Sequence, residues 1–163
     1  MATKTPFKTR NDMSATTRNT VVGLLNQHLA DLSDLYSQVK QAHWNVKGPN
    51  FQQLHELFDM LAGIVIGHID IVAERVTMLG GIAHGTVRMA SENSRLAPYD
   101  EEIYQDLEVA AMIADRYATV AESARKAIDE ADEAGDMDSA DLFTALSRDL
   151  DKGLWFIEAH LQG

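Results

Sequence analysis

Apolar residues recur mostly at steps of three or four along four long stretches of this chain, the spacing that lines one face of an α-helix. The stretches run from about Ser14 to Val46, from about Phe51 to Leu79, from about Asp100 to Ala134 and from about Met137 to Leu161. No segment alternates apolar and polar residues as a half-buried strand does. The pattern therefore predicts an all-α protein.

Three breaks separate the predicted helices. Lys47-Gly48-Pro49-Asn50 ends the first helix and supplies an Asn cap for the second, Gly80-Gly81 ends the second, and Gly135 separates the last two. Residues 82–99 are rich in Gly, Ser and Asn and make a connection long enough to cross a bundle from end to end. We expect a short helix within this connection, near Val87–Ala90.

Four amphipathic helices joined by one long crossover predict a ferritin-like four-helix bundle. We expect residues 13–163 to form it, behind a flexible, basic arm of residues 1–12. Each helix should bury one apolar stripe. The expected stripe of the second helix is Leu54, Leu57, Leu61, Ile64, Val72, Val76 and Leu79, and that of the third is Tyr104, Leu107, Ala111, Ala114, Ala118 and Ala121.

The composition narrows the classes of function. A net charge of −11 argues against a surface that binds nucleic acid broadly and suits a protein that attracts cations. The absence of cysteine excludes disulfides, thiol catalysis and thiolate metal sites. The first residues lack the apolar core of a secretory signal, and no stretch approaches the ~20 apolar residues of a membrane span, so the expected location is the cytoplasm.

Two histidines and three acids are the candidate functional residues: His43, His55, Asp59, Asp70 and Glu74. His43 occupies a core-facing position near the end of the first helix, and the other four fall within an arc of roughly 100° on the second. With a rise of ~1.5 Å per residue, His55 and Glu74 stand roughly 28 Å apart along the helix axis. Metal ligands sit only ~2 Å from the ion, so one helix cannot close both halves around it.

A two-fold axis removes this difficulty. His55 and Glu74 are equally distant from the point between Ile64 and Val65, and so are Asp59 and Asp70. An axis at that point places His55 opposite Glu74 of a second chain, and Asp59 opposite its Asp70. Gly63 and Gly67 lie beside it, and since glycine costs ~1 kcal/mol in a helix interior, close approach of a second backbone is one explanation for them. The mixed nitrogen and oxygen ligands with open positions suit redox iron better than structural zinc.

Other interpretations of these residues exist. A lone His on an apolar stripe is more often a hydrogen-bonded core residue, and single acids on a helix usually face solvent. No His follows Glu by three positions, as in the Glu-x-x-His motif of ordinary ferritins. His55-Glu56-Leu57-Phe58-Asp59 matches half of a zinc-protease signature, but Asp stands where that signature requires His.

At these residues the chain resembles the Dps family, the miniature ferritins known as DNA-binding proteins from starved cells. The resemblance extends nearly from end to end. It rests on Thr9–Asp12, Lys40–Gly48, His55–Asp59, His68–Arg75 followed by Leu79-Gly80-Gly81, and Ser147–Glu158.

The resemblance implies a hollow dodecamer with a ferroxidase centre at each two-fold interface. His43, His55 and Asp59 would come from one subunit and Asp70 and Glu74 from its neighbour. Such proteins oxidise Fe(II), preferentially with hydrogen peroxide rather than O₂, and store ferric mineral, which protects the cell from oxidative damage. Zinc is the expected competitor of iron.

The resemblance also implies roles outside the ligand set. Trp44 would lie beside the centre, as an acceptor of stray oxidising equivalents or as interface packing, and Asp141 would line an iron-entry pore unless it is merely a solvated acid. Arg75 is expected to pair with Asp151. Nucleoid DNA compaction is the alternative function, with Lys4, Lys8 and Arg10 as possible DNA contacts. His28, His68, His84 and His160 match no ligand position.

Overall fold

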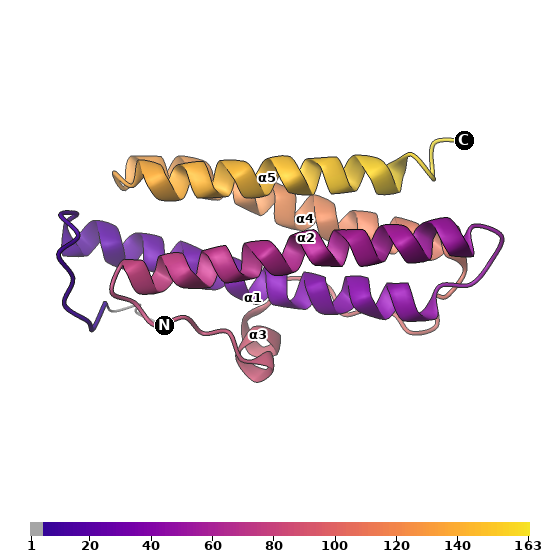
Figure 1. Cartoon of the computed structure of the whole chain (residues 1–163), viewed down its shortest axis with the longest axis horizontal. Coiled ribbons are helices and arrows are strands. Elements are labelled where there is room, and N and C mark those ends of the chain that lie inside the picture. Colours follow the sequence, from indigo (N-terminus) through magenta and orange to yellow (C-terminus); the bar gives the residue numbers. More distant parts are fainter. Residues whose placement is uncertain (1–4) are drawn as a thin grey trace.

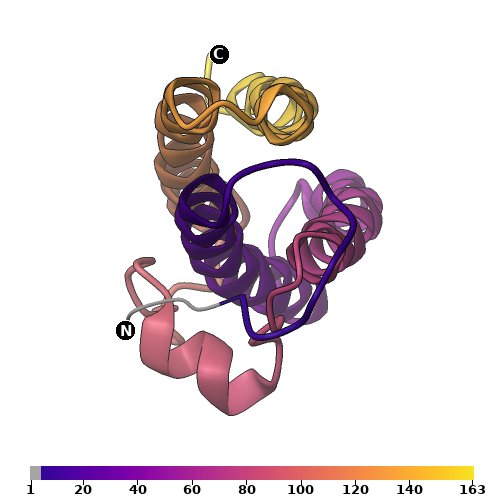
Figure 2. The same cartoon turned by 90° about the vertical axis from the view of Figure 1, so that its left-hand side faces the viewer.

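The computed structural model describes residues 5–163, which form five helices and no strand. The helices are α1 (Ala15–Asn45), α2 (Phe51–Met78), α3 (Val87–Asn93), α4 (Asp106–Glu133) and α5 (Met137–Glu158). The four long helices form a bundle, and the short α3 lies outside it in the crossover (Figures 1 and 2). The predicted all-α bundle with a short crossover helix is confirmed. Within the described residues, no helix combines the length and apolar character needed to cross a membrane.

The chain direction explains the long crossover. α1 and α2 form one antiparallel hairpin and α4 and α5 form another, each joined by a short turn (Figure 1). α2 and α4 run in the same direction, so the chain must return along the bundle between them. The crossover makes this return along the outside of α1 (Figure 2).

The bundle core is aliphatic and closely packed. α1 contributes leucines, α4 contributes mainly small residues, and α5 contributes Phe143 and Leu146. Each fully buried Leu or Phe stabilises the fold by roughly 1.5–3 kcal/mol relative to an exposed one. The buried stripe of α4 consists of Val109, Ala110, Ile113, Ala114, Tyr117, Val120, Ala121, Ala124, Ala127 and Ala131.

This stripe corrects the expected face of the third helix. Tyr104, Leu107, Ala111 and Ala118 are exposed, and of the six expected residues only Ala114 and Ala121 are buried. Alanine is common on several sides of α4, so its spacing does not identify the core face. The larger side chains Ile113 and Tyr117 do so instead.

The third long helix also begins later than expected, at Asp106 rather than near Asp100. The Lys47 N–H donates to the Tyr104 carbonyl at 2.9 Å, and the Asp106 N–H donates to the Lys47 carbonyl at 2.8 Å. These bonds hold Tyr104 and Gln105 extended against the α1–α2 turn. Since the Tyr104 carbonyl and the Asp106 N–H bond to Lys47 of a distant segment, they are not available for the bonds of an earlier helical turn.

Arg75 does not pair with Asp151, which is a further correction. Its guanidinium donates to Asp136 Oδ1 at 2.7 Å and to Ser139 Oγ at 2.9 Å, and Asp136 caps α5 by accepting from the Ser139 N–H. α2 and α5 are antiparallel, so the end of α2 meets the start of α5. Asp151 lies farther along α5 and pairs with Arg125 of α4 at 2.8 Å.

The N-terminal segment contacts the bundle at two places. The Thr5 N–H donates to Asn19 Oδ1 at 2.9 Å, and the Phe7 N–H donates to the Gly80 carbonyl at 3.2 Å. Gly80 has a φ of +82°, and a Cβ added there would lie 2.7 Å from the Phe7 carbonyl oxygen. The end of α2 and the N-terminal segment therefore fit together only if residue 80 has no side chain.

We predict that Gly80→Ala destabilises the protein more than Gly135→Ala. Gly135 has a similar φ of +87°, but nothing lies within 4 Å of an added Cβ, so it carries only the backbone cost of roughly 1–2 kcal/mol. Gly80→Ala adds the clash with Phe7. Urea unfolding of both variants measures the difference, and deletion of residues 1–8 should abolish it. Equal losses in the full-length variants would contradict this account of Gly80.

Candidate metal centre

His43 of α1 and His55 of α2 face each other where the hairpin closes. Their rings stack with centroids 3.9 Å apart and an interplanar angle of 18°. His43 Nδ1 lies 2.7 Å from the His55 carbonyl oxygen, and His55 Nδ1 lies 2.8 Å from the His43 carbonyl oxygen. A carbonyl oxygen can only accept, so both Nδ1 atoms carry the proton. A metal can then bind only at Nε2, the nitrogen of each ring that faces away from the carbonyl bond.

The hairpin geometry produces this reciprocal pair. The Gly48-Pro49 turn reverses the chain, so the last turn of α1 lies level with the second turn of α2. Phe51, in the first turn of α2, also stacks on His55, with ring centroids 5.1 Å apart. The two imidazoles are therefore fixed in orientation as well as in tautomer, which is how metal-ligating histidines are commonly held.

Asp59 lies one turn beyond His55 and is exposed. Its Oδ1 atom is 3.9 Å from His43 Nε2 and 2.6 Å from Lys40 Nζ. The hydrogen bond from Lys40, and then the charge of Lys40, lower the pKa of the Asp59 carboxyl below its usual range. The Lys40 ammonium also lies 5.7 Å from the centre of the exposed Trp44 ring. The Lys40 ammonium thus contacts a carboxylate that also lies near the Nε2 atom of His43.

Sequence reasoning missed Lys40. The signal was its position three residues before His43, which places the two side chains one helical turn apart. A lysine at that spacing is ordinarily a solvated residue, so only its contact with Asp59 of the next helix distinguishes it.

The two histidines and Asp59 line an open hollow of about 470 Å³. Its other walls are Gln52, Glu56, Met60 and Gly63, all on α2, with Gln52 donating to Glu56. The hollow places nitrogen and oxygen donors beside solvent. It lies at the edge of the α2 surface that carries the remaining candidate acids.

Asp70 and Glu74 are exposed farther along α2. The single chain does not bring them to His43, His55 and Asp59. Among residues 5–163, no group of three or more His, Asp or Glu side chains of one chain is arranged to hold a metal ion. The five candidate residues thus form two separate groups on one helical hairpin.

Between the two groups, α2 presents an uncovered apolar surface. Nothing in the described part of the chain lies within 4 Å of a Cβ added at Gly63 or Gly67, so contacts among residues 5–163 give no steric reason for either glycine. Ile64, which was expected in the core, is 37% exposed because Ala62 and Val65 take the inward positions. The α2 apolar surface comprises Met60, Gly63, Ile64, Ile66, Gly67, Ile71 and Met78 and is exposed in the single chain. Contiguous exposed apolar surface of this kind often marks a protein–protein contact.

The other predicted residues are placed as follows. Trp44 is 62% exposed beside the hollow, and Asp141 is exposed in the second turn of α5. Lys8 and Arg10 are exposed, and Lys4 lies outside the described residues.

The unassigned histidines have separate surroundings. His68 points away from Asp70, and its Nε2 atom pairs with Asp149 Oδ2 of α5 at 2.8 Å. His160 Nδ1 donates to the Phe156 carbonyl, and His84 is exposed in the crossover. His28 is buried between α1 and α4.

Comparison with known proteins identifies the family of this chain. Residues 22–163 match the model of the ferritin-like domain. The chain is 48% identical over 155 residues to a protein of Agrobacterium fabrum named DNA protection during starvation protein, covering 95% of this chain and 96% of the relative. A protein of the same name from Brevibacillus brevis is 34% identical over 152 residues, covering 92% of this chain and 100% of the relative.

Solved structures of Dps proteins have the same fold as this chain. The structure of DpsA14 from Streptomyces coelicolor superposes with a TM-score of 0.93 at 32% identity, covering 99% of this chain and 96% of that one. The structure of Dps from Mycobacterium smegmatis gives 0.91 at 33% identity, covering 96% and 94%. The chain belongs to the Dps family of ferritin-like proteins.

Proposed function

We propose that this protein is a ferroxidase and iron store whose catalytic unit is a two-fold dimer. The observation that carries the proposal is the reciprocal histidine pair. It fixes two Nε2 lone pairs beside Asp59, in an open hollow at the edge of the uncovered α2 apolar surface. Fe(II) is the substrate, and hydrogen peroxide or O₂ is the oxidant.

The two-fold arrangement supplies the missing ligands. With an axis between Ile64 and Val65, the Asp70 and Glu74 carboxylates of one subunit reach the His43, His55 and Asp59 group of the other. Gly63 and Gly67 then lie where the two α2 helices approach, which accounts for the open space above them. The uncovered isoleucines and methionines of α2 become the buried interface, as an isologous contact requires.

The ligand chemistry suits iron oxidation. Neutral imidazole nitrogens hold Fe(II), and carboxylates, as hard oxygen donors, favour Fe(III). Two Fe(II) ions each give one electron to hydrogen peroxide, whose O–O bond breaks, and two protons complete the formation of two waters. This removes both reactants that generate hydroxyl radicals. Zinc accepts the same nitrogen and oxygen ligands without redox chemistry and is therefore the expected competitor.

Lys40 contacts the part of the proposed centre that one subunit contributes. Its ammonium offsets the charge of Asp59 while no metal is present. An arriving Fe(II) ion must displace this contact to use the Asp59 carboxylate. Trp44, whose ring lies near Lys40, would accept stray oxidising equivalents from the same centre or pack in the interface.

The assembly proposed from the family is a cytoplasmic hollow dodecamer that encloses ferric mineral. Exposed Asp141 is the candidate pore residue, because a ring of carboxylates focuses cations inward. A net charge of −11 per chain favours the same cation flow.

Direct DNA binding is the alternative function. Its support is the name of the relatives, DNA protection during starvation protein, and the exposed Lys8 and Arg10. Removing iron and peroxide protects DNA without contact, so the name fits both functions. A gel shift at low salt, with and without residues 1–10, separates them, since phosphate contacts weaken steeply with salt.

We predict that two inactive variants restore each other when they assemble together. One carries His43→Ala and His55→Ala, and the other carries Asp70→Ala and Glu74→Ala. Each alone should lose nearly all rapid Fe(II) oxidation, because every site lacks two of its five proposed ligands. Coexpressed chains that pair at random should recover about a quarter of the wild-type sites, since one site of each mixed dimer is intact.

The measurement is the initial rate of ferric absorbance after peroxide is added to anaerobic, Fe(II)-loaded protein. The control is a mixture of the two variants purified and assembled separately, which should stay inactive. Absence of recovery in coassembled dimers would rule out a site shared between two chains.

We also predict that Gly67→Leu prevents assembly without unfolding the chain. Leucine favours a helix by nearly 1 kcal/mol relative to glycine, and the single chain has open space at this position. The side chain should instead block the approach of a second α2. Light scattering gives the assembly mass and circular dichroism the helix content. Ala111→Leu on α4 is the control, and a Gly67→Leu protein with wild-type mass would contradict the proposed interface.

A further inference from the structure

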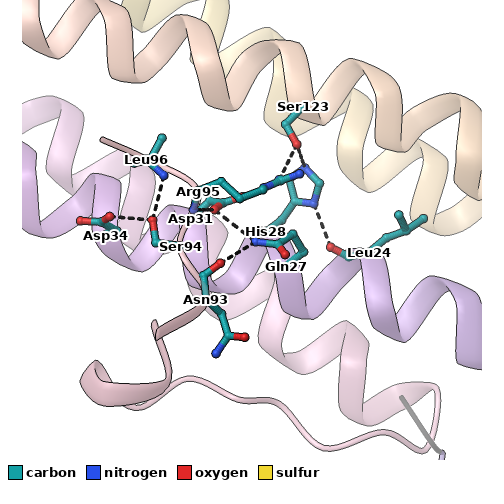
Figure 3. Close-up of polar contacts among 10 residues, drawn as sticks. All are labelled: Leu24, Gln27, His28, Asp31, Asp34, Asn93, Ser94, Arg95, Leu96 and Ser123. Carbon is teal, nitrogen blue, oxygen red and sulfur yellow. Dashed lines mark hydrogen bonds and ion pairs between the residues drawn. The ribbon is translucent and has the colours of Figure 1, made fainter. Parts of the chain in front are cut away.

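Polar contacts fasten the end of the crossover to the bundle (Figure 3). Gln27 donates to the Asn93 carbonyl at 2.9 Å, and Ser94 donates to Asp34 at 2.6 Å. The Arg95 backbone N–H donates to Asp31 Oδ1 at 2.9 Å, and the Arg95 side chain binds Asp31 Oδ2. Residues 93–96 contain almost no regular structure of their own after α3 ends, so these side chains of α1 hold them in place.

A series of hydrogen bonds within this network passes through a buried histidine, His28. Arg95 Nη2 lies 2.6 Å from Ser123 Oγ of α4, and Ser123 Oγ lies 3.0 Å from His28 Nε2 of α1. His28 Nδ1 lies 2.8 Å from the Leu24 carbonyl oxygen. His28 is 2% exposed, and its ring packs against Phe143 of α5 with centroids 4.8 Å apart. Figure 3 shows the ring between Leu24 and Ser123.

While His28 is neutral, the chemistry of these four groups fixes the direction of every hydrogen bond between them. The Leu24 carbonyl can only accept, so His28 Nδ1 carries a proton, and the Arg95 guanidinium can only donate. Ser123 Oγ therefore accepts from Arg95 and donates its own proton to His28 Nε2. This arrangement exists only while His28 is neutral, because a protonated Nε2 has no lone pair to accept with.

The surroundings of His28 also disfavour a positive charge on its ring, next to that of Arg95. Desolvation by burial is the main cause that lowers the pKa of His28 below its ordinary value, and the Arg95 charge adds to it. The Leu24 carbonyl, Asp31 and Ser123 act in the opposite direction, but the net pKa shift is downward. The charged groups that face the ring are thus Asp31 from α1 and Arg95 from the crossover. Ser123 from α4 and Phe143 from α5 contribute no charge.

We propose that His28 is an acid-sensitive latch for the crossover. When a proton enters at Nε2, Ser123 can no longer donate to the ring, and two cations then flank one hydroxyl group. The Arg95–Ser123 contact weakens, and residues 93–96 loosen from α1 and α4. The crossover joins α2 to α4, so the latch links acidity to the segment that connects the two hairpins.

The direction of the pH effect follows from linkage. The pKa of His28 is lower in the latched state than in an open state where the ring is solvated, so the open state binds the proton more tightly. The latch therefore contributes its full stability above the ordinary pKa of 6.5 and loses it as the pH falls below that value. The loss is complete once the pH passes below the lowered pKa.

Amide hydrogen exchange of the intact protein tests the latch. We expect peptides that cover residues 87–97 to lose about tenfold protection between about pH 7.5 and about pH 5, after correction for intrinsic exchange rates and relative to α1 core peptides. In His28→Gln the protection of these peptides should not depend on pH. His160→Gln is the matched control, because His160 makes the same type of bond to a carbonyl four residues earlier but has no serine or arginine partner in the described residues. It should retain the wild-type response.

A second variant keeps the test decisive if His28→Gln folds poorly. His28→Leu combined with Ser123→Ala replaces both partners by apolar groups, a change that is often nearly neutral for stability. Its crossover should also be insensitive to pH. A wild-type crossover whose protection does not fall in acid, or an acid response that persists in these variants, would overturn the proposal.

Discussion

The two faces of α2 are the constraint on which the rest of the structure depends. One face buries Leu54, Phe58, Leu61 and Val65 in the bundle, and this fixes the α1–α2 hairpin and the stacked His43–His55 pair at its closed end. The opposite face leaves apolar side chains, two glycines and two acids without partners among residues 5–163. A helix that is apolar on both sides must be covered on both, so the same element that builds the bundle also calls for a second subunit.

Much of this arrangement could be predicted from the sequence, since it depends on local periodicity. The four long helices and the short crossover helix follow from apolar spacing and from Gly and Pro breaks. The facing positions of His43 and His55 follow from the length of the turn between them. The α1–α2 turn is short, so the residues on either side of it have only one way to meet.

What the sequence did not reveal depends on contacts between distant residues. The start of α4 is displaced because Lys47 takes the backbone bonds of Tyr104 and Asp106. Arg75 meets Asp136 rather than Asp151 because of the antiparallel register of α2 and α5. Neither Lys40 nor His28 stands out in the sequence. The fold brings Lys40 to Asp59, and it brings His28 to Ser123, which in turn contacts Arg95. The lining of the core by alanine likewise hides which face of α4 is buried.

The central claim is that one metal centre is built from two chains. Anomalous scattering at the iron and zinc absorption edges, from crystals soaked in either metal, tests it most directly. The account predicts a metal peak near His43 Nε2, His55 Nε2 and Asp59 of one subunit, with Asp70 and Glu74 of a two-fold neighbour completing the shell. A metal held entirely by residues of one chain, or a metal-soaked crystal with no peak at this hairpin, would contradict it.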